Sequence, residues 1–243
     1  MGYKLSYKRF GEQAILIEWP QVIQKDILKD LLRFKALIIS HFKDLKLNVT
    51  TAYNSLLIND LTNSINYKDL IPELKSLYEL KKDIKTENTL LWKIPVCYDL
   101  EFGLDLNDMA KNKNMSIENI IDIHSKSQYI VYFIGFLPGF LYLGGLDEKL
   151  HYPRKDKPRM RIERGAVAIG GEQTGIYPME SPGGWNIIGN SPINLFNTDN
   201  EIPCFAKAGD SIQFYSITSE KHEEIKVLVN ANVYQLENEV IHG

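Results

Sequence analysis

A segment rich in glycine and proline, between Ile169 and Pro192, carries polar and aromatic side chains that suit a binding site. Glycine lets backbone amides approach a ligand closely. Gln, Thr and Ser supply neutral hydrogen bonds, and Tyr and Trp supply flat apolar walls. A pair of tight turns in a β-barrel would explain the same composition. We predict a small-molecule site here, formed by Gln173, Thr174, Tyr177, Ser181, Gly183, Gly184 and Trp185.

A run of basic residues, "HYPRKDKPRMRIERGA", precedes this segment. If "RMRIE" is extended, Arg159 and Arg161 project from the same face of the strand, and their two guanidinium groups could converge on a carboxylate or a phosphate. A solvated strand face, with its charge relieved by Asp156 and Glu163, is the alternative explanation.

His124 falls on the same helical face as Ile117, Ile120 and Ile121. Imidazole titrates near neutral pH, so this histidine is a candidate general acid or base. A core-facing histidine with a hydrogen-bond partner would show the same pattern, and both interpretations stay open.

An uncharged stretch, "SQYIVYFIGFLPGFLYLGGL", follows this histidine directly and is long enough to cross a bilayer. Its glycines and Pro138 argue against a continuous helix, because these residues are the poorest helix formers. We therefore predict no membrane span, but a buried strand at "YIVYFIG" and a tight, aromatic-lined loop at "FLPGFLYLGG".

Composition limits the remaining function classes. The 243 residues carry a net charge of −3, which gives no reason to expect nucleic-acid binding. Cys97 and Cys204 are the two cysteines, without a C-x-x-C pattern, so we expect no disulfide framework and no metal site. We expect a cytoplasmic protein, since the amino terminus lacks a secretory signal pattern. No phosphate-loop motif is present, so any ATP is not held by a Walker-type loop in this chain.

The elements that must position these residues fall into two groups, and we predict domains at 1–88 and 89–243. The first group reads as strand, strand, helix, strand, strand, helix, with helices near 22–42 and 67–82, where apolar residues recur every three or four positions. We expect "TLLWKIPV" to close this sheet and the charged "KKDIKTEN" to be the linker.

The second group begins with two short helices, for which Asp105 and Ser116 are expected to act as N-caps. Short β-rich runs broken by glycine and proline follow, which favours an antiparallel barrel or sandwich. The runs that we assign to strands are "GAVAIGG", "GWNIIG", "INLF", "DSIQFYSI" and "IKVLVNANVYQL".

Several of these segments, in this order, resemble the signature of a family formed by the B subunits of 5-oxoprolinase, also described as the allophanate hydrolase subunit 1 or KipI-like family. The resemblance covers essentially the whole chain and is densest from about 94 to 196. It rests on "EFGLDL", "IHSKSQYIVYFIGFLPGFLYLGGLDEKL", "PRKDKPRMRIERGAVAIGGEQTGIYP" and "SPGGWNIIGNSP".

The resemblance implies an α+β protein, with a small ferredoxin-like α/β amino-terminal domain followed by a cyclophilin-like antiparallel β-barrel. It also implies a complex with a KipA-like C subunit and an A subunit of 5-oxoprolinase, which uses ATP to open the lactam of 5-oxoproline and release glutamate. The alternative, from another family member, is a regulator that inhibits autophosphorylation of a sensor histidine kinase. The chain lacks a Met-Lys-Met motif, so we expect no attached biotin.

With the family in view, we predict that Arg159 and Arg161 bind a carboxylate or phosphoryl group, that Gln173 and Thr174 orient it, and that His124 carries the proton. We further predict substrate contacts from Phe136, Pro138, Phe140 and Tyr142. The sequence departs from the family pattern at Leu104, at Glu163-Arg164 and at Asn190-Ser191. Asn190 replaces an arginine, which weakens the case for an anion site in the "IGNSP" loop.

Overall fold

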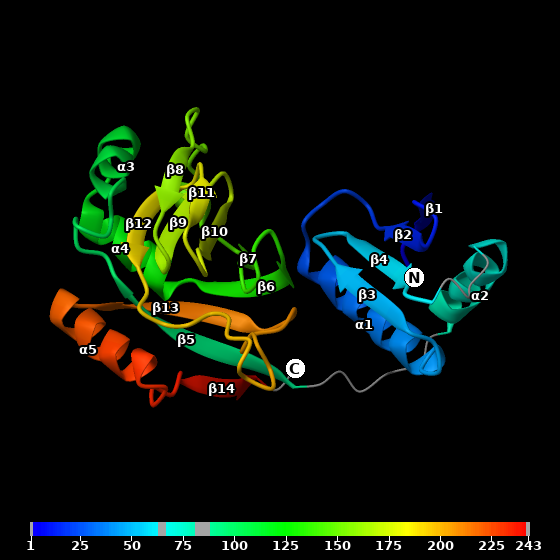
Figure 1. Ribbon diagram of the computed structural model, residues 1–243. Coiled ribbons are helices and arrows are strands. Elements are labelled where there is room, and N and C mark those ends of the chain that lie inside the picture. The colour runs from blue at the N-terminus through cyan, green and yellow to red at the C-terminus, as the bar shows by residue number, and fades with distance from the viewer. Residues whose placement is uncertain (1, 63–66, 81–87, 242–243) are drawn as a thin grey trace. The chain divides into compact units, whose positions relative to one another are not determined.

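The computed structural model describes residues 2–62, 67–80 and 88–241. The chain divides into two compact units, Met1–Glu87 and Asn88–Gly243, each with its own sheet and hydrophobic core. Figure 1 shows the elements of each unit. Residues 81–87, most of the expected linker, lie outside the described residues.

The first unit is an antiparallel sheet of four strands, in the order β1-β2-β4-β3, with two helices. The three- and four-residue repeat of α1 places Ile27, Leu31, Phe34 and Ile38 in the core, as the sequence predicts. The elements are β1 (Ser6–Phe10), β2 (Ala14–Glu18), α1 (Lys25–His41), β3 (Leu47–Thr51), β4 (Ser55–Asp60) and α2 (Tyr67–Glu79).

Seven strands of the second unit close into a barrel, in the order β12-β9-β10-β7-β6-β13-β5. Asn190 of β12 pairs with Cys97 of β5, which closes the ring, and β14 continues the sheet beside β5. The strands are β5 (Thr89–Cys97), β6 (Gln128–Ile134), β7 (Leu141–Gly144), β9 (Ala166–Gly170), β10 (Gln173–Ile176), β12 (Asn186–Asn190), β13 (Ser211–Ile217) and β14 (Asn238–Ile241).

Helices and a two-stranded ribbon surround this barrel (Figure 1). The ribbon consists of β8 (Arg159–Ile162) paired with β11 (Ser181–Gly183). The helices are α3 (Leu106–Lys113), α4 (Ile117–Lys126), the short 3-10 helix η1 (Glu148–Leu150) and α5 (Ser219–Asn230). Ser116 caps α4 as expected, because its hydroxyl accepts a hydrogen bond from the amide of Asn119. The α+β class and the barrel are confirmed.

The wall of the barrel separates two cores, because successive residues of a strand point to opposite faces. Leu141, Leu143, Val167, Ile169 and Ile176 point inward and join the main barrel core. Their neighbours point outward and form a second cluster under the ribbon. That outer cluster contains Phe140, Ile162, Ala166, Ala168, Tyr177, Trp185 and Ile187.

Several expected elements differ. "TLLWKIPV" is part of β5 and belongs to the barrel, not to the first sheet. β5 and β13 pair in parallel, so the barrel is not wholly antiparallel. "INLF" is not a strand.

The segment "IKVLVN", expected as a strand, is the end of helix α5. His222, Ile225 and Val229 are buried at spacings of three and four, which is a helical period. Thr218 caps the helix, because its hydroxyl accepts a hydrogen bond from the amide of Lys221. The β-branched residues of this segment favour a strand by their composition. The Thr218 cap and the helical spacing of the buried residues favour the helix that the structure shows.

Candidate functional site

His124 lies inside the barrel and is fully buried. Its Nδ1 atom lies 2.7 Å from the hydroxyl of Tyr98, and its Nε2 atom lies 2.9 Å from the hydroxyl of Thr174. The ring stacks on Phe214 with centroids 4.6 Å apart. Both nitrogens therefore have partners within the protein.

The hydrogen bonds fix the state of this histidine. The Thr174 hydroxyl donates its single proton to the carbonyl of Ala168 at 3.1 Å, so it accepts from His124 Nε2–H. Tyr98 must then donate to an unprotonated Nδ1. Burial lowers the pKa of His124 to about 3, so the imidazole is neutral. The geometry favours the core-facing interpretation over the proton carrier.

Gln173 and Thr174, expected to orient one ligand together, face opposite sides of the barrel wall because they are neighbours in β10. Thr174 is completely buried beside His124. Gln173 lies on the outer side, with its Oε1 atom 3.5 Å from the guanidinium of Arg154. Of the two, Gln173 alone belongs to the outer surface.

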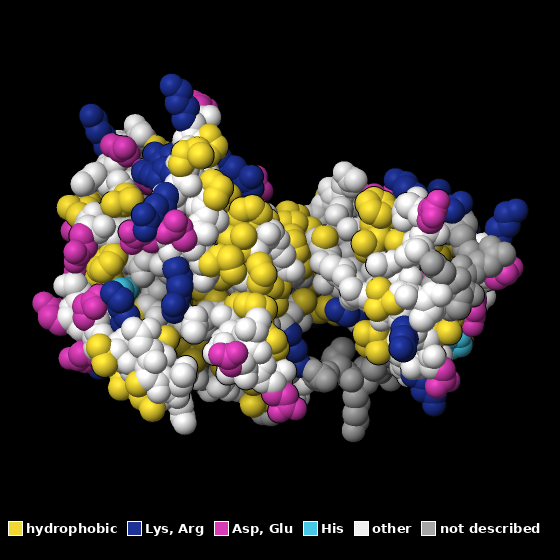
Figure 2. Space-filling view, viewed as in Figure 1, with side chains coloured by type: hydrophobic (Ala, Val, Ile, Leu, Met, Phe, Trp, Pro, Cys, Tyr) yellow, Lys and Arg dark blue, Asp and Glu magenta, His cyan; other side chains and the backbone are white. Residues whose placement is uncertain are grey.

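The predicted aromatic residues do come together, outside the barrel. The ring of Phe140 lies edge-on to Tyr177 and to Trp185, with centroids 5.6 Å apart in each case. It also lies 5.0 Å from the ring of Tyr142. These four side chains form one group, which we call the aromatic site. Figure 2 shows hydrophobic side chains gathered on this part of the second unit, over β6 and β7.

The loop from Gly135 to Phe140 carries the exposed edge of the aromatic site. Phe136 has a backbone φ of 66° and is 63% exposed, and its ring touches Phe140 edge-on at 5.6 Å. Pro138 is also exposed. A non-glycine residue with the φ of Phe136 is strained, and such strain concentrates at binding sites.

Two glycines of the aromatic site are packing requirements. A Cβ atom on Gly183 would lie 2.3 Å from the hydroxyl oxygen of Tyr177, and one on Gly170 would lie 2.5 Å from the indole of Trp185. Gly184 accepts a hydrogen bond from the amide of Lys155 at 2.7 Å. Glycine here lets the ribbon and the rings approach each other.

Arg159 binds a carboxylate of the protein itself. Its guanidinium makes two hydrogen bonds of 2.8 Å to Asp105, which is 2% exposed. Lys155 adds an ion pair at 2.7 Å, and the amide of Ile187 donates to the same carboxylate at 2.7 Å. Burial opposes ionisation of Asp105, but these hydrogen bonds outweigh it and lower its pKa.

This arrangement corrects two expectations. Asp105 precedes α3 as predicted, but its side chain makes no capping hydrogen bond and joins α3 to the ribbon instead. Arg159 and Arg161 do not converge on one group, because Arg161 pairs with the exposed Glu180 at 2.7 Å. Each arginine has a separate carboxylate partner.

Arg154 is the cation best placed to meet a ligand at the aromatic site. Its guanidinium lies 5.5 Å from the centroid of the Trp185 ring, a cation–π contact, and its side chain is exposed. It is hydrogen-bonded to Gln173 at 3.5 Å, near the limit for such a bond. The sequence placed Arg154 in a basic run but gave no signal of its position on Trp185.

Ser181 adds an unsatisfied group to the aromatic site. It is 8% exposed, and its hydroxyl has no hydrogen-bond partner within the described part of the chain. Ser181 pairs with Ile162 across the ribbon, so both side chains face the outer cluster. A buried hydroxyl without a partner is a group that a ligand or a water molecule can satisfy.

In the "IGNSP" loop, the side chain of Asn190 is committed to internal contacts. The amide of Asn190 donates to the carbonyl of Arg164 at 3.0 Å, and its oxygen lies 2.9 Å from Nε2 of the buried His222. Asn190 thus links helix α5 to strand β12, at the point where β12 pairs with β5 and closes the barrel. With Asn190 held in this way, the case for an anion site in this loop stays weak.

Metal ligands do not cluster in the ranges 2–62, 67–80 and 88–241. Within these ranges, no three His, Cys, Asp or Glu side chains are grouped to hold a metal ion. No helix in the same ranges has the length and apolar character to cross a membrane. The first part of the uncharged stretch is a strand, as predicted, but the predicted loop is shorter than expected, because Leu141–Gly144 form the strand β7.

Comparison with known proteins agrees with the fold. Residues 5–206 match the family model described as "Carboxyltransferase domain, subdomain C and D". The solved structure of the protein TTHA0988 superposes with a TM-score of 0.74 at 29% identity, over 85% of this chain and 40% of that one. The present chain therefore spans less than half of that longer protein.

Two curated relatives carry the same name. The B subunit of 5-oxoprolinase from Bacillus subtilis is 40% identical over 171 residues, which are 66% of this chain and 71% of the relative. The B subunit of 5-oxoprolinase from Haemophilus influenzae is 45% identical over 152 residues, which are 62% of this chain and 70% of the relative. The resemblance read from the motifs is confirmed.

Proposed function

The chain belongs to the family of the carboxyltransferase domain, subdomain C and D, and we propose that it is the B subunit of an ATP-dependent 5-oxoprolinase. The observation that carries this proposal is its 40% and 45% identity to two 5-oxoprolinase B subunits. We propose that it acts in the cytoplasm with an A subunit and a KipA-like C subunit, and that the complex binds ATP. No observation favours the kinase-inhibitor alternative.

The proposed reaction explains why ATP is needed. A lactam is a poor electrophile, and transfer of the terminal phosphoryl group of ATP to the lactam oxygen activates the ring carbon. Water adds to that carbon and the C–N bond breaks, which leaves the amine and an acyl phosphate. A second water releases phosphate, so the products are glutamate, ADP and phosphate. These steps need groups that hold the substrate and stabilise developing negative charge.

We propose that this chain supplies the surface that binds 5-oxoproline. The flat ring would lie at the exposed edge of the aromatic site, against Phe136 and the half-buried Tyr142, because Trp185 itself is only 5% exposed. Arg154 would bind the carboxylate, because the guanidinium of Arg159 is already held by Asp105. Gln173 and Ser181 would offer neutral hydrogen bonds to the lactam.

Two of the predicted roles change in this proposal. Arg159 becomes a positioning residue, which holds the ribbon over the aromatic site through Asp105. His124 becomes structural, because it is neutral, fully buried and separated from the aromatic site by the barrel wall. The general base is therefore assigned to one of the partner proteins.

Reconstitution tests the proposed function. The purified chain is combined with the A and C subunits of a 5-oxoprolinase, and glutamate release from 5-oxoproline is measured with and without ATP. We expect release that requires this chain, both partners and ATP. A complex that forms and is well folded, yet releases no glutamate, would contradict the proposal.

A further inference from the structure

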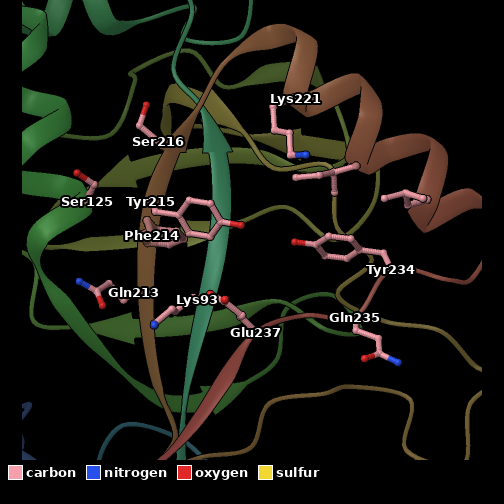
Figure 3. Close-up of a pocket in the computed structure, with 12 residues that line it drawn as sticks. Lys93, Ser125, Gln213, Phe214, Tyr215, Ser216, Lys221, Tyr234, Gln235 and Glu237 are labelled. Atoms are coloured by element: carbon pink, nitrogen blue, oxygen red, sulfur yellow. The ribbon is translucent and has the colours of Figure 1, made fainter.

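The second unit contains a cavity of about 630 Å³ that is separate from the aromatic site. It lies between β13, β5, α4, α5 and the chain segment that precedes β14 (Figure 3). Cavities of this size hold small molecules. None of the predicted site residues lines it.

One end of the cavity is rich in hydrogen-bond donors. The hydroxyls of Tyr215 and Tyr234 point toward each other, with Lys221 above them (Figure 3). Burial and a hydrogen bond to Tyr215 raise the pKa of Tyr234. Whichever hydroxyl donates to the other, one hydroxyl proton of the pair is left for a ligand. Lys221 pairs with Glu224 at 2.9 Å, but both side chains are more than half exposed. Such an exposed pair is weak, so a ligand carboxylate can replace it.

The other end is acidic. Glu237 lines the cavity there, next to Lys93 (Figure 3). Lys93 is already paired with Glu239, and Glu239 and Glu237 both raise the pKa of Lys93. Two carboxylates and one ammonium leave one negative charge at this end, which favours a cationic group.

Neutral polar groups also line the cavity. The side chains of Gln213, Ser216 and Gln235 make no hydrogen bond to the described part of the chain. Ile225 and Leu228 of α5 supply an apolar wall. The lining thus offers a donor end, an acidic end and two side-chain amides, those of Gln213 and Gln235.

We propose that this cavity binds the free amino acid glutamate, with its side-chain carboxylate at Lys221 and Tyr215 and its ammonium at Glu237. The choice of amino acid rests on the proposed function, whose product is glutamate. 5-Oxoproline has no ammonium group, because its nitrogen is part of the lactam. The cavity therefore distinguishes product from substrate and is a product-sensing site, distinct from the aromatic site.

Calorimetry and amide NMR on the full chain alone test this inference. Glutamate or 5-oxoproline is titrated without ATP and without partner proteins. We expect glutamate to bind and to shift the side-chain amide signals of Gln213 and Gln235, while 5-oxoproline leaves those signals unchanged. Lys221→Met and Glu237→Gln should each weaken glutamate binding at least tenfold.

Lys226→Met is the matched control, because Lys226 lies on the same helix, pairs with Glu223 and does not line the cavity. It should bind glutamate as the wild type does. Equal shifts of Gln213 and Gln235 with 5-oxoproline, no binding of glutamate, or unchanged affinity in Glu237→Gln would overturn the inference. Because no turnover is measured, a failed reconstitution would count against the proposed function and leave this result standing.

Discussion

Arg159 and Asp105, 54 residues apart in the sequence, are joined by two parallel hydrogen bonds of 2.8 Å. This pair links the ribbon to the start of α3, on the outer side of the barrel. From the sequence, Arg159 is a candidate to bind substrate, but in the structure its guanidinium already binds a carboxylate of the protein. Asp105 and His124 are both buried in this unit. Hydrogen bonds keep Asp105 ionised by lowering its pKa, whereas burial keeps His124 neutral by lowering its pKa.

Asp105→Asn should destabilise the second unit by about 3 kcal/mol, because it leaves Arg159 and Lys155 without their buried partner. Urea unfolding followed by tryptophan fluorescence measures the change. Glu180→Gln is the control, since Glu180 is an exposed partner of Arg161, and it should cost less than about 1 kcal/mol. Similar losses for both variants would argue against a special role for Asp105.

His124 should make the protein less stable in acid. Its folded pKa of about 3 lies below the value of about 6.5 in an unfolded chain, so the unfolded state takes up a proton first as the pH falls. Between these values stability should fall by about 1.4 kcal/mol per pH unit from this group. His124→Gln should remove this slope, whereas His41→Gln, at an exposed position, should keep it. The measurement is unfolding free energy against pH.

Arg154→Ala should raise the KM for 5-oxoproline in the reconstituted complex by about 10- to 100-fold, the effect of losing a charged hydrogen bond. The fold should be unaffected, because the guanidinium is exposed. Arg161→Ala is the matched control and should leave the KM near its wild-type value. If the two variants had the same KM, the carboxylate would bind elsewhere.

Phe136→Gly should change the stability of the isolated chain by less than about 1 kcal/mol, because the exposed ring is lost while the strained φ is relieved. Turnover in the reconstituted complex should fall, because the ring belongs to the exposed edge of the aromatic site. Thermal unfolding and glutamate release are measured side by side. Full turnover would show that Phe136 contacts neither substrate nor partner.

Gly170→Ala should cost about 1–3 kcal/mol, because the added methyl group would lie 2.5 Å from the indole of Trp185. Gly135→Ala is the control, since its methyl group would meet Phe133 at an ordinary distance of 3.4 Å. Chemical denaturation of the two variants compares them. Equal stability would mean that Trp185 can move without cost.

The sequence predicts the fold well where periodicity is strong. Helix α1 and the strands of the first unit lie where their patterns place them, and the Ser116 cap is correct. The strand β5 was assigned to the wrong sheet, because its partners β12, β13 and β14 all lie far away in the sequence. A local pattern identifies a strand but not the strand with which it pairs.

The candidate site was predicted in part. The aromatic residues do gather, but the sequence could not show that Arg159 already has a partner or that Arg154 lies on Trp185. Gln173 and Thr174 could have been separated from the start, because neighbours in a strand face opposite sides. No sequence motif marks the cavity proposed to bind glutamate, because its lining residues come from five separate segments of the chain.

The parallel pairing of β5 with β13 has a consequence for how the protein is made. Asp210, just before β13, holds the amide of Leu90 and the indole of Trp92 across a gap of about 120 residues. A ribosome releases β5 long before it has synthesised these partners. The barrel therefore cannot close during most of translation, while all the pairings of the first sheet lie within residues 6–60 and are available early. Until β13 emerges, β5 is an apolar strand with open edges, a state that is prone to aggregation.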